Sequence, residues 1–202
     1  MKRTLLFATI LGSVSLVAQT PVAEVSGVAG TAFFQAPGQP ETQLRAGTRV
    51  VPGAVIRTGP AAAVDLYLGS DGGVLRLTQN TVLSVEKLEQ TNAITDIYLY
   101  LQQGTALGNG SRIRPGLRYR IKVANGVAAI GDAAFRLHAE GYAVVVSGKA
   151  QFAYITPAGN PEIFSMTAPP AVYFSPTEGV KGAPRELVRE VTDQSKAKLG
   201  SR

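Results

Sequence analysis

The chain has 202 residues, of which 45% are hydrophobic and 17% charged, with no Cys, no Trp and a single His. A chain this apolar buries enough surface to offset the entropy cost of ordering, which excludes an intrinsically disordered protein. The missing cysteines exclude disulfides, thiolate nucleophiles and Cys-based metal sites, and one His leaves few zinc or acid–base arrangements. We therefore expect a folded protein that is not an enzyme and carries no cofactor and no metal.

The first residues have the layout of a secretory signal peptide. Lys2 and Arg3 precede an uncharged apolar stretch over residues 5–18. This stretch is too short to cross a bilayer, which takes about 20 apolar residues. We expect residues 1–20 to be removed on export to the periplasm or the cell surface, and no later segment to span a membrane. The alternative is a buried or anchoring N-terminal helix.

Loss of these two cations lowers the net charge from +6 to +4. A balance this close to neutral does not indicate a nucleic-acid partner.

Between residues 21 and 176, short apolar segments alternate with turn residues, which is typical of an all-β domain. The clearest strand alternates Val64, Leu66 and Leu68 with Asp65 and Tyr67, and the Asp-Gly pair that follows predicts a hairpin. The same alternation predicts strands near residues 74–77, 97–101, 119–123, 135–139, 152–155 and 172–174. No helical pattern of ten residues interrupts them, which argues against parallel βαβ units.

Two segments differ from this alternation. Residues 143–146 are continuously apolar, which predicts a strand buried on both faces. Residues 185–199 follow Pro184 and precede Gly200, which is typical of helix boundaries. We expect residues 177–202 to form a polar tail with a short, mostly solvated helix that adds little to the stability of the domain.

Several motifs resemble the FecR domain of bacterial envelope proteins. They are Leu44-x-x-Gly47, Val55-Ile56-Arg57-Thr58-Gly59, the strand Ala63–Leu68 with its hairpin, and a strand ending in Gln103-Gly104. The resemblance extends roughly over residues 22–155. Where that family has a Val-Arg-Gly-Thr-x-Phe step, this chain has Ile130, Gly131, Asp132 and then Phe135, so a role for the family's Arg does not carry over.

The founding members of the FecR family are membrane-spanning regulators that restrain a sigma factor inside the cell and sense a receptor outside it. This sequence shows neither their cytoplasmic helical segment nor their transmembrane helix. The resemblance therefore implies a stand-alone exported domain without the regulator activity. It also implies an elongated all-β roll or a solenoid-like stack of short strands.

The densest run of positive charge is the candidate polyanion-binding segment. It contains Arg112, Arg114, Arg118, Arg120 and Lys122 and no acidic residue. The turn pair Pro115-Gly116 predicts a hairpin, in which the last three cations share one strand face at spacings of about 6.7 Å. Such a row suits a linear polyanion such as an envelope glycan. The alternative, and the commoner use of such a pattern, is a charged edge strand that prevents edge-to-edge aggregation.

Other polar and aromatic residues give weaker indications. His138 alternates with apolar neighbours, and no Gly-x-Ser-x-Gly motif accompanies it, so we interpret it as a surface residue. Tyr98 and Tyr100 alternate with apolar residues, and we interpret them as packing residues, with stacking on a sugar or a base as the alternative.

We expect an exported, non-catalytic interaction module of the bacterial cell envelope that recognises a protein or an anionic glycan. The alternative is a structural subunit of an envelope or surface assembly, in which strand edges or the C-terminal helix pack against other copies. Oligomeric state separates the two, and the sequence leaves it open.

Overall fold

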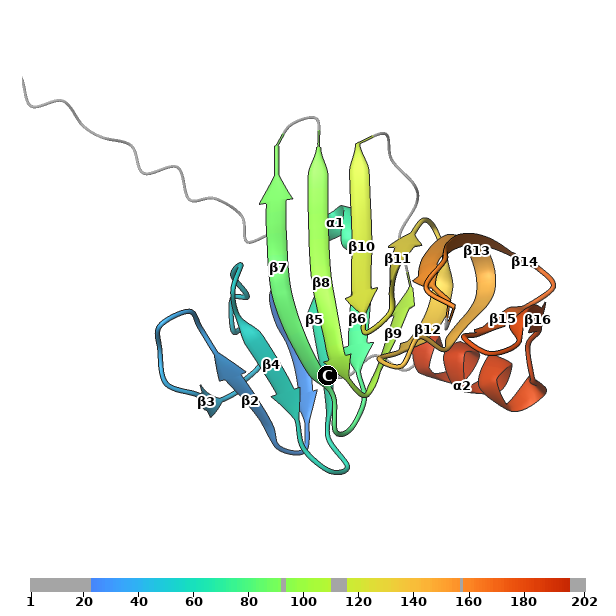
Figure 1. Ribbon diagram of the computed structural model, residues 1–202. Helices are drawn as coiled ribbons and strands as arrows, with labels where there is room; N and C mark the ends of the chain where they lie inside the picture. The colour runs from blue at the N-terminus through green and yellow to red at the C-terminus, as the bar shows by residue number, and fades with distance from the viewer. Residues whose placement is uncertain (1–22, 92–93, 110–115, 157, 197–202) are drawn as a thin grey trace, which may run out of the picture.

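The computed structural model describes residues 23–91, 94–109, 116–156 and 158–196, and almost all of its regular structure is β-sheet (Figure 1). The strands are β1 (Glu24–Ala29), β2 (Ala32–Gln35), β3 (Thr42–Gln43), β4 (Val55–Thr58), β5 (Ala63–Tyr67), β6 (Val74–Leu77), β7 (Val82–Gln90), β8 (Thr95–Gln103), β9 (Thr105–Asn109), β10 (Leu117–Val123), β11 (Gly126–Ile130), β12 (Ala134–His138), β13 (Ala143–Ile155), β14 (Pro161–Ala168), β15 (Val172–Ser175) and β16 (Gly179–Gly182). The helices are the single turn α1 (Gly69–Gly72) and α2 (Arg185–Lys196). The prediction of an all-β fold with a short C-terminal helix is confirmed.

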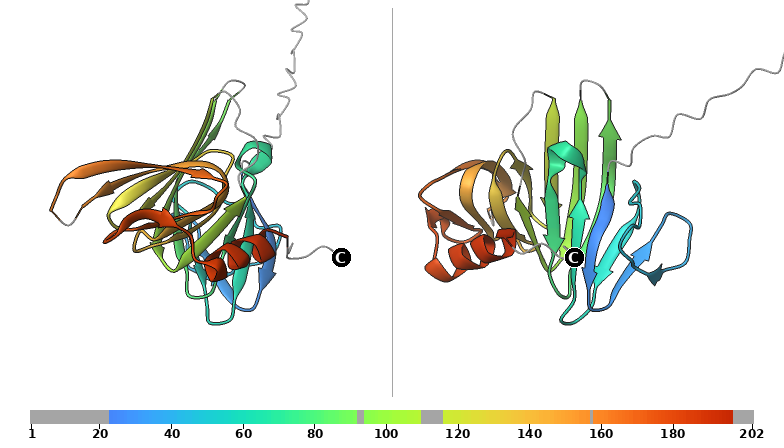
Figure 2. Two further views of the ribbon diagram at one scale, coloured as in Figure 1. Left: turned by 90° about the vertical axis from the view of Figure 1, so that its right-hand side faces the viewer. Right: turned by 180° about the vertical axis from the view of Figure 1, so that it is seen from behind.

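The strands form two layers that face each other (Figure 2). Layer A contains β1, β5, β6, β9, β12, the first part of β13, β15 and β16. Layer B contains β2, β3, β4, β7, β8, β10, β11, the rest of β13 and β14. The inner faces share one core, in which Leu66 and Leu75 of layer A and Leu99 of layer B are fully buried.

The strand order is that of a roll and not of a solenoid-like stack. The hydrogen-bonded path runs β1-β5-β6-β9-β12-β13-β11-β10-β8-β7-β4-β2-β3. In a solenoid each repeat would contact only its neighbours along the chain. Here the chain passes repeatedly between the layers, so that strands distant in sequence lie side by side.

Strand β13 belongs to both layers and joins them. Residues 143–147 pair with β12 and β15, whereas residues 148–155 pair with β14 and, over most of their length, with β11. The change occurs at Gly148, which has a φ of 77° and whose missing Cβ would lie 2.5 Å from the carbonyl oxygen of Asp132. Only glycine adopts this conformation without steric cost in so little space.

The predicted hairpin between residues 63–67 and 74–77 is confirmed, with α1 as its connection. Asp65 lies on the polar side of this strand but is also buried, with only 2% of its surface exposed. Its carboxylate oxygens lie 2.7 and 2.8 Å from Nε and Nη2 of Arg76 on the paired strand. A bidentate ion pair satisfies the carboxylate and permits its burial.

The C-terminal region is joined to the fold more closely than expected. Residues 179–182 pair with β15, and although most of α2 is exposed or half-buried, Val191 on it is only 1% exposed. Val191 packs against Leu107, Ala134 and Val144 on the outer side of layer A. This contact explains the continuously apolar segment at residues 143–146, whose prediction as a strand buried on both faces is confirmed for residues 143–145. Among the described residues, no helix has the length and apolar character needed to cross a membrane.

We expect Val191→Ala to lower the free energy of unfolding by about 2 kcal/mol, because it removes two buried methyl groups and leaves a cavity. Arg189→Ala on the same helix is the control, since Arg189 is exposed and forms a surface ion pair with Asp193 on the same helix. Urea unfolding of both variants checks this. Equal stability of Val191→Ala and the unmodified protein would show that α2 adds nothing to the core.

Candidate binding face on strands β8 and β10

Strand β10 lies inside layer B. Residues 117–122 pair in parallel with β8, and residues 119–123 pair antiparallel with β11. Strand β9, in layer A, carries the chain from β8 towards β10, which explains how a parallel pair forms without a helix. Both edges of β10 are therefore occupied. The edge-strand alternative is wrong, because residues 119–122 are paired on both sides. The first arm of the hairpin predicted at Pro115-Gly116, with Arg112 and Arg114, lies outside the described residues.

Arg118, Arg120 and Lys122 share the outer face of β10, as the alternation predicts. Arg118 and Lys122 are exposed and Arg120 is half-buried. The side chains between and after them point into the core and are at most 3% exposed: Tyr119, Ile121 and Val123. The buried residues fix the register, so that the cations lie on one surface.

Two tyrosines of β8 lie beside these cations (Figure 1 shows the two strands). The parallel register pairs Tyr98 with Arg120 and Tyr100 with Lys122. The Cζ atom of Arg120 lies 5.0 Å from the centre of the Tyr98 ring, and Nζ of Lys122 lies 4.6 Å from the centre of the Tyr100 ring. Each contact is worth about 0.5–1 kcal/mol at an exposed site. The tyrosines thus pack beneath the cations and hold their side chains in place.

Asp96 is the central acidic group of this face, and the sequence analysis missed it. Its side chain is buried, and its two oxygens lie 2.9 Å from Nη2 of Arg120 and 3.0 Å from Nζ of Lys87. Burial alone raises the pKa of Asp96, but the hydrogen bonds from Lys87 and Arg120 together hold it below its usual value. The hydrogen bonds of Lys87 to Asp96 and to Glu89 raise the pKa of the Lys87 amine.

The charges of this face are unevenly compensated. Lys87 and Arg120 have carboxylate partners, whereas Arg118 and Lys122 have none within 4.0 Å in the part of the chain that the structure describes. These two cations are four residues apart on one strand, which is about 13 Å. We call Arg118, Arg120, Lys122, Tyr98 and Tyr100 the cation–tyrosine face.

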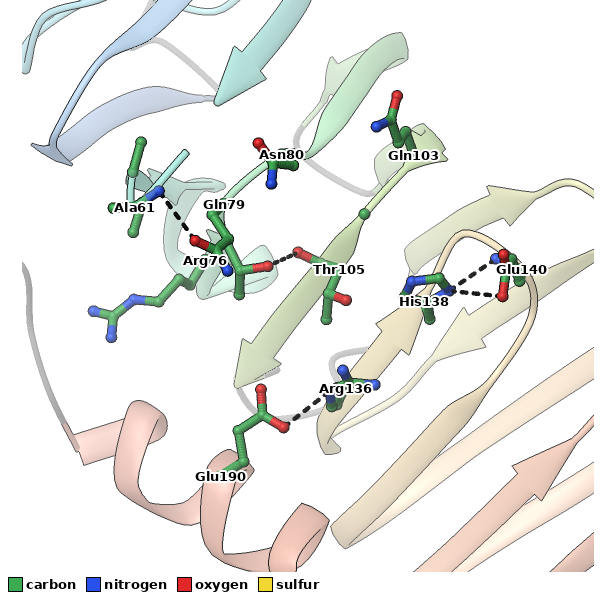
Figure 3. Close-up of a pocket in the computed structure, with 14 residues that line it drawn as sticks. Ala61, Arg76, Gln79, Asn80, Gln103, Thr105, Arg136, His138, Glu140 and Glu190 are labelled. Carbon is green, nitrogen blue, oxygen red and sulfur yellow. Dashed lines mark hydrogen bonds and ion pairs between the residues drawn. The ribbon is translucent and has the colours of Figure 1, made fainter. Parts of the chain in front are cut away.

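The structure also contains a pocket of about 850 Å³ on the outer side of layer A, next to α2 (Figure 3). His138 lies in its wall and is not simply a surface residue, because its side chain is 29% exposed. Nδ1 of His138 accepts a hydrogen bond from the backbone N–H of Glu140 at 3.3 Å. The pocket forms from turns that are distant in sequence, so no single motif could have indicated it.

Comparison with known proteins shows a likeness of fold. A crystal structure of a putative anti-sigma factor from Parabacteroides distasonis ATCC 8503 superposes with a TM-score of 0.50 at 19% sequence identity, covering 71% of this chain. This chain spans 65% of that protein. Neither the family models nor the curated proteins give a match to the sequence. An identity this low carries information on the fold alone.

We expect Asp96→Asn to lower the free energy of unfolding at pH 7 by about 1 kcal/mol, since two charged hydrogen bonds weaken. Because the folded pKa of Asp96 is depressed, its contribution is fully present above the unfolded pKa of about 3.9 and is lost as the pH falls through the folded value. Urea unfolding between pH 7 and pH 3 checks this.

The unmodified protein loses more stability than Asp96→Asn over the acidic part of that range. Glu89→Gln, which removes an exposed carboxylate from the same face, is the control. Parallel pH profiles for Asp96→Asn and the unmodified protein would contradict the assignment.

Proposed function

We propose that this protein is an exported, non-catalytic interaction module of the bacterial cell envelope that recognises an anionic glycan through the cation–tyrosine face. The observation that carries the proposal is the pair of uncompensated cations, Arg118 and Lys122, on either side of the ion-paired Arg120. All three sit on a central strand whose inner side chains are locked in the core. A linear polyanion can contact both cations at once.

The order of this face favours binding. Binding to side chains that are already fixed costs less conformational entropy than binding that must first order them. The tyrosine rings hold Arg120 and Lys122, and Asp96 holds Arg120 from a second side. Arg120 and Lys122 are therefore held in place before any ligand binds.

A glycan fits this face better than a protein partner does. Protein interfaces are centred on large exposed side chains that lose water on binding, whereas Tyr98 and Tyr100 are half-buried beneath the cations. The most exposed large apolar residues of the described chain belong to other strands and loops: Phe33, Tyr67, Val74, Ile94, Ile155, Ile163 and Val180. None of them lies within β8 or β10.

The fold likeness to a putative anti-sigma factor is compatible with an interaction role without catalysis. The signal-like residues 1–20 support export. Export and a role without catalysis are both parts of the proposal.

We expect the double variant Arg118→Gln and Lys122→Gln to bind lipopolysaccharide and a sulfated polysaccharide column about tenfold more weakly, with a flatter dependence on salt. The fold is unaffected because only outer side chains change. The control is Arg45→Gln with Arg49→Gln, which removes two exposed cations from the loop between β3 and β4. Equal retention of both double variants over a range of ionic strength would contradict the proposal.

The structural-subunit alternative has one observation in its favour. Strand β14 pairs with β13 alone, and Ile163 on it is 73% exposed near Ile155, which is 49% exposed. An apolar edge of this kind can pair with another chain. Sedimentation of the same samples separates the two functions, since an interaction module stays monomeric as concentration rises and a structural subunit assembles.

A further inference from the structure

We infer that the pocket on the outer side of layer A is a second binding site, and that it takes an uncharged oligosaccharide. This inference goes beyond the proposed function, because the pocket is lined by strands of layer A, turns and α2, and by Gln103 alone from the strands of layer B, so that it shares no residue with the cation–tyrosine face. Its volume of about 850 Å³ is within the range of small-molecule sites. Figure 3 shows side chains from several turns, from β6 and β12 and from α2 around it.

The backbone is unusual at this pocket. Ala61 and Asn80, with φ of 53° and 54°, are the non-glycine residues of the described chain that have positive φ, and both line the pocket. Gly104, with φ of 80°, lines it too. Left-handed conformations cost a residue with a side chain roughly 1–2 kcal/mol, and such residues gather at ligand sites. Three turns are therefore held in special conformations around one cavity.

A buried threonine network makes these turns rigid. The hydroxyl of Thr58 donates to the carbonyl of Thr78 at 2.5 Å and accepts from the backbone N–H of Thr81 at 2.8 Å. The backbone N–H of Thr105 donates to the Thr81 hydroxyl at 3.1 Å. Thr58, Thr81 and Thr105 are at most 7% exposed. The pocket floor is thus formed before a ligand binds.

The pocket presents groups that can both donate and accept hydrogen bonds. The Gln79 side-chain oxygen accepts from the backbone N–H of Ala61 at 3.0 Å, which directs the amide nitrogen as a donor. The side-chain amides of Asn80 and Gln103 have no protein partner among the described residues. Nδ1 of His138 accepts from Glu140, so in the neutral ring the proton is on Nε2.

The positive charges in the pocket are already compensated. Arg76 is held by Asp65 at 2.7 Å, and Nε of Arg136 lies 3.1 Å from Glu190. Glu140 adds an exposed carboxylate to the rim. No surplus positive charge faces the cavity, which disfavours an anionic ligand. Sugar hydroxyl groups donate and accept, and so match amides, guanidinium groups and carboxylates together.

The test is binding of maltohexaose, cellohexaose and hexaacetylchitohexaose, each at up to about 5 mM, followed by NMR shifts of the folded protein. We expect at least one of them to bind and to shift amides of residues 61–63, 78–80 and 103–105. The double variant Asn80→Gly and Gln103→Ala should bind at least about tenfold more weakly. Glycine prefers the positive φ of position 80, so the fold is retained.

Gln90→Ala with Gln151→Ala, which removes two exposed amides elsewhere, is the control and should bind normally. Arg118→Gln with Lys122→Gln should also leave this binding unchanged, which separates the pocket from the cation–tyrosine face. The inference is overturned if none of the three oligosaccharides binds. It is also overturned if Asn80→Gly with Gln103→Ala binds as well as the control. Hexagalacturonate is the anionic probe, and a shift of the pocket amides with it but with none of the three uncharged oligosaccharides would overturn the inference too.

Discussion

The architecture depends on one strand that serves two layers. β13 can leave layer A and enter layer B only because Gly148 takes a left-handed conformation against the backbone of Asp132. The core between the layers then continues on both sides of Gly148. Val145 before it and Phe152 after it are at most 1% exposed. Both outer surfaces depend on this junction. Val144 supports α2 on one side of the molecule, and β11 beside β13 holds β10 on the other.

The two outer surfaces use charge in opposite ways. In layer A each buried or half-buried guanidinium group has a carboxylate partner, such as Arg76 with Asp65. In layer B, Asp96 compensates Arg120 and leaves the cations on either side of it open. A compensated pair has little net charge with which to attract an anion, whereas a cation without a carboxylate partner on a fixed strand adds to the local positive potential. This difference is the basis on which we propose an uncharged ligand for the pocket and an anionic one for the cation–tyrosine face.

Local patterns in the sequence predicted much of the fold. The alternation around Leu66 gave the strand and its hairpin, and the run at residues 143–146 indicated burial on both faces because period two is lost when both sides of a strand are covered. The row of cations on β10 also follows from alternation. Each of these features needs information from only a few neighbouring residues.

The parts that could not be predicted depend on pairing between distant strands. β10 pairs in parallel with β8 because the chain passes through the opposite layer in between, and no local pattern indicates this pairing. The same non-local register brings Asp96 to Arg120 and places His138 opposite Thr105 beside the pocket. The buried face of α2 was missed because its few apolar residues do not indicate that the outer side of layer A has an apolar surface for them to pack against.

Native-state hydrogen exchange tests the central claim that Gly148 couples the layers into one unit. The amides of Leu75 in β6 and Leu99 in β8 report on layers A and B, and both residues are fully buried. The account predicts that both exchange with the free energy of global unfolding, and that Gly148→Ala lowers both by the same amount. Loss of protection at only one of the two amides in Gly148→Ala would show that the layers open separately, and would contradict it.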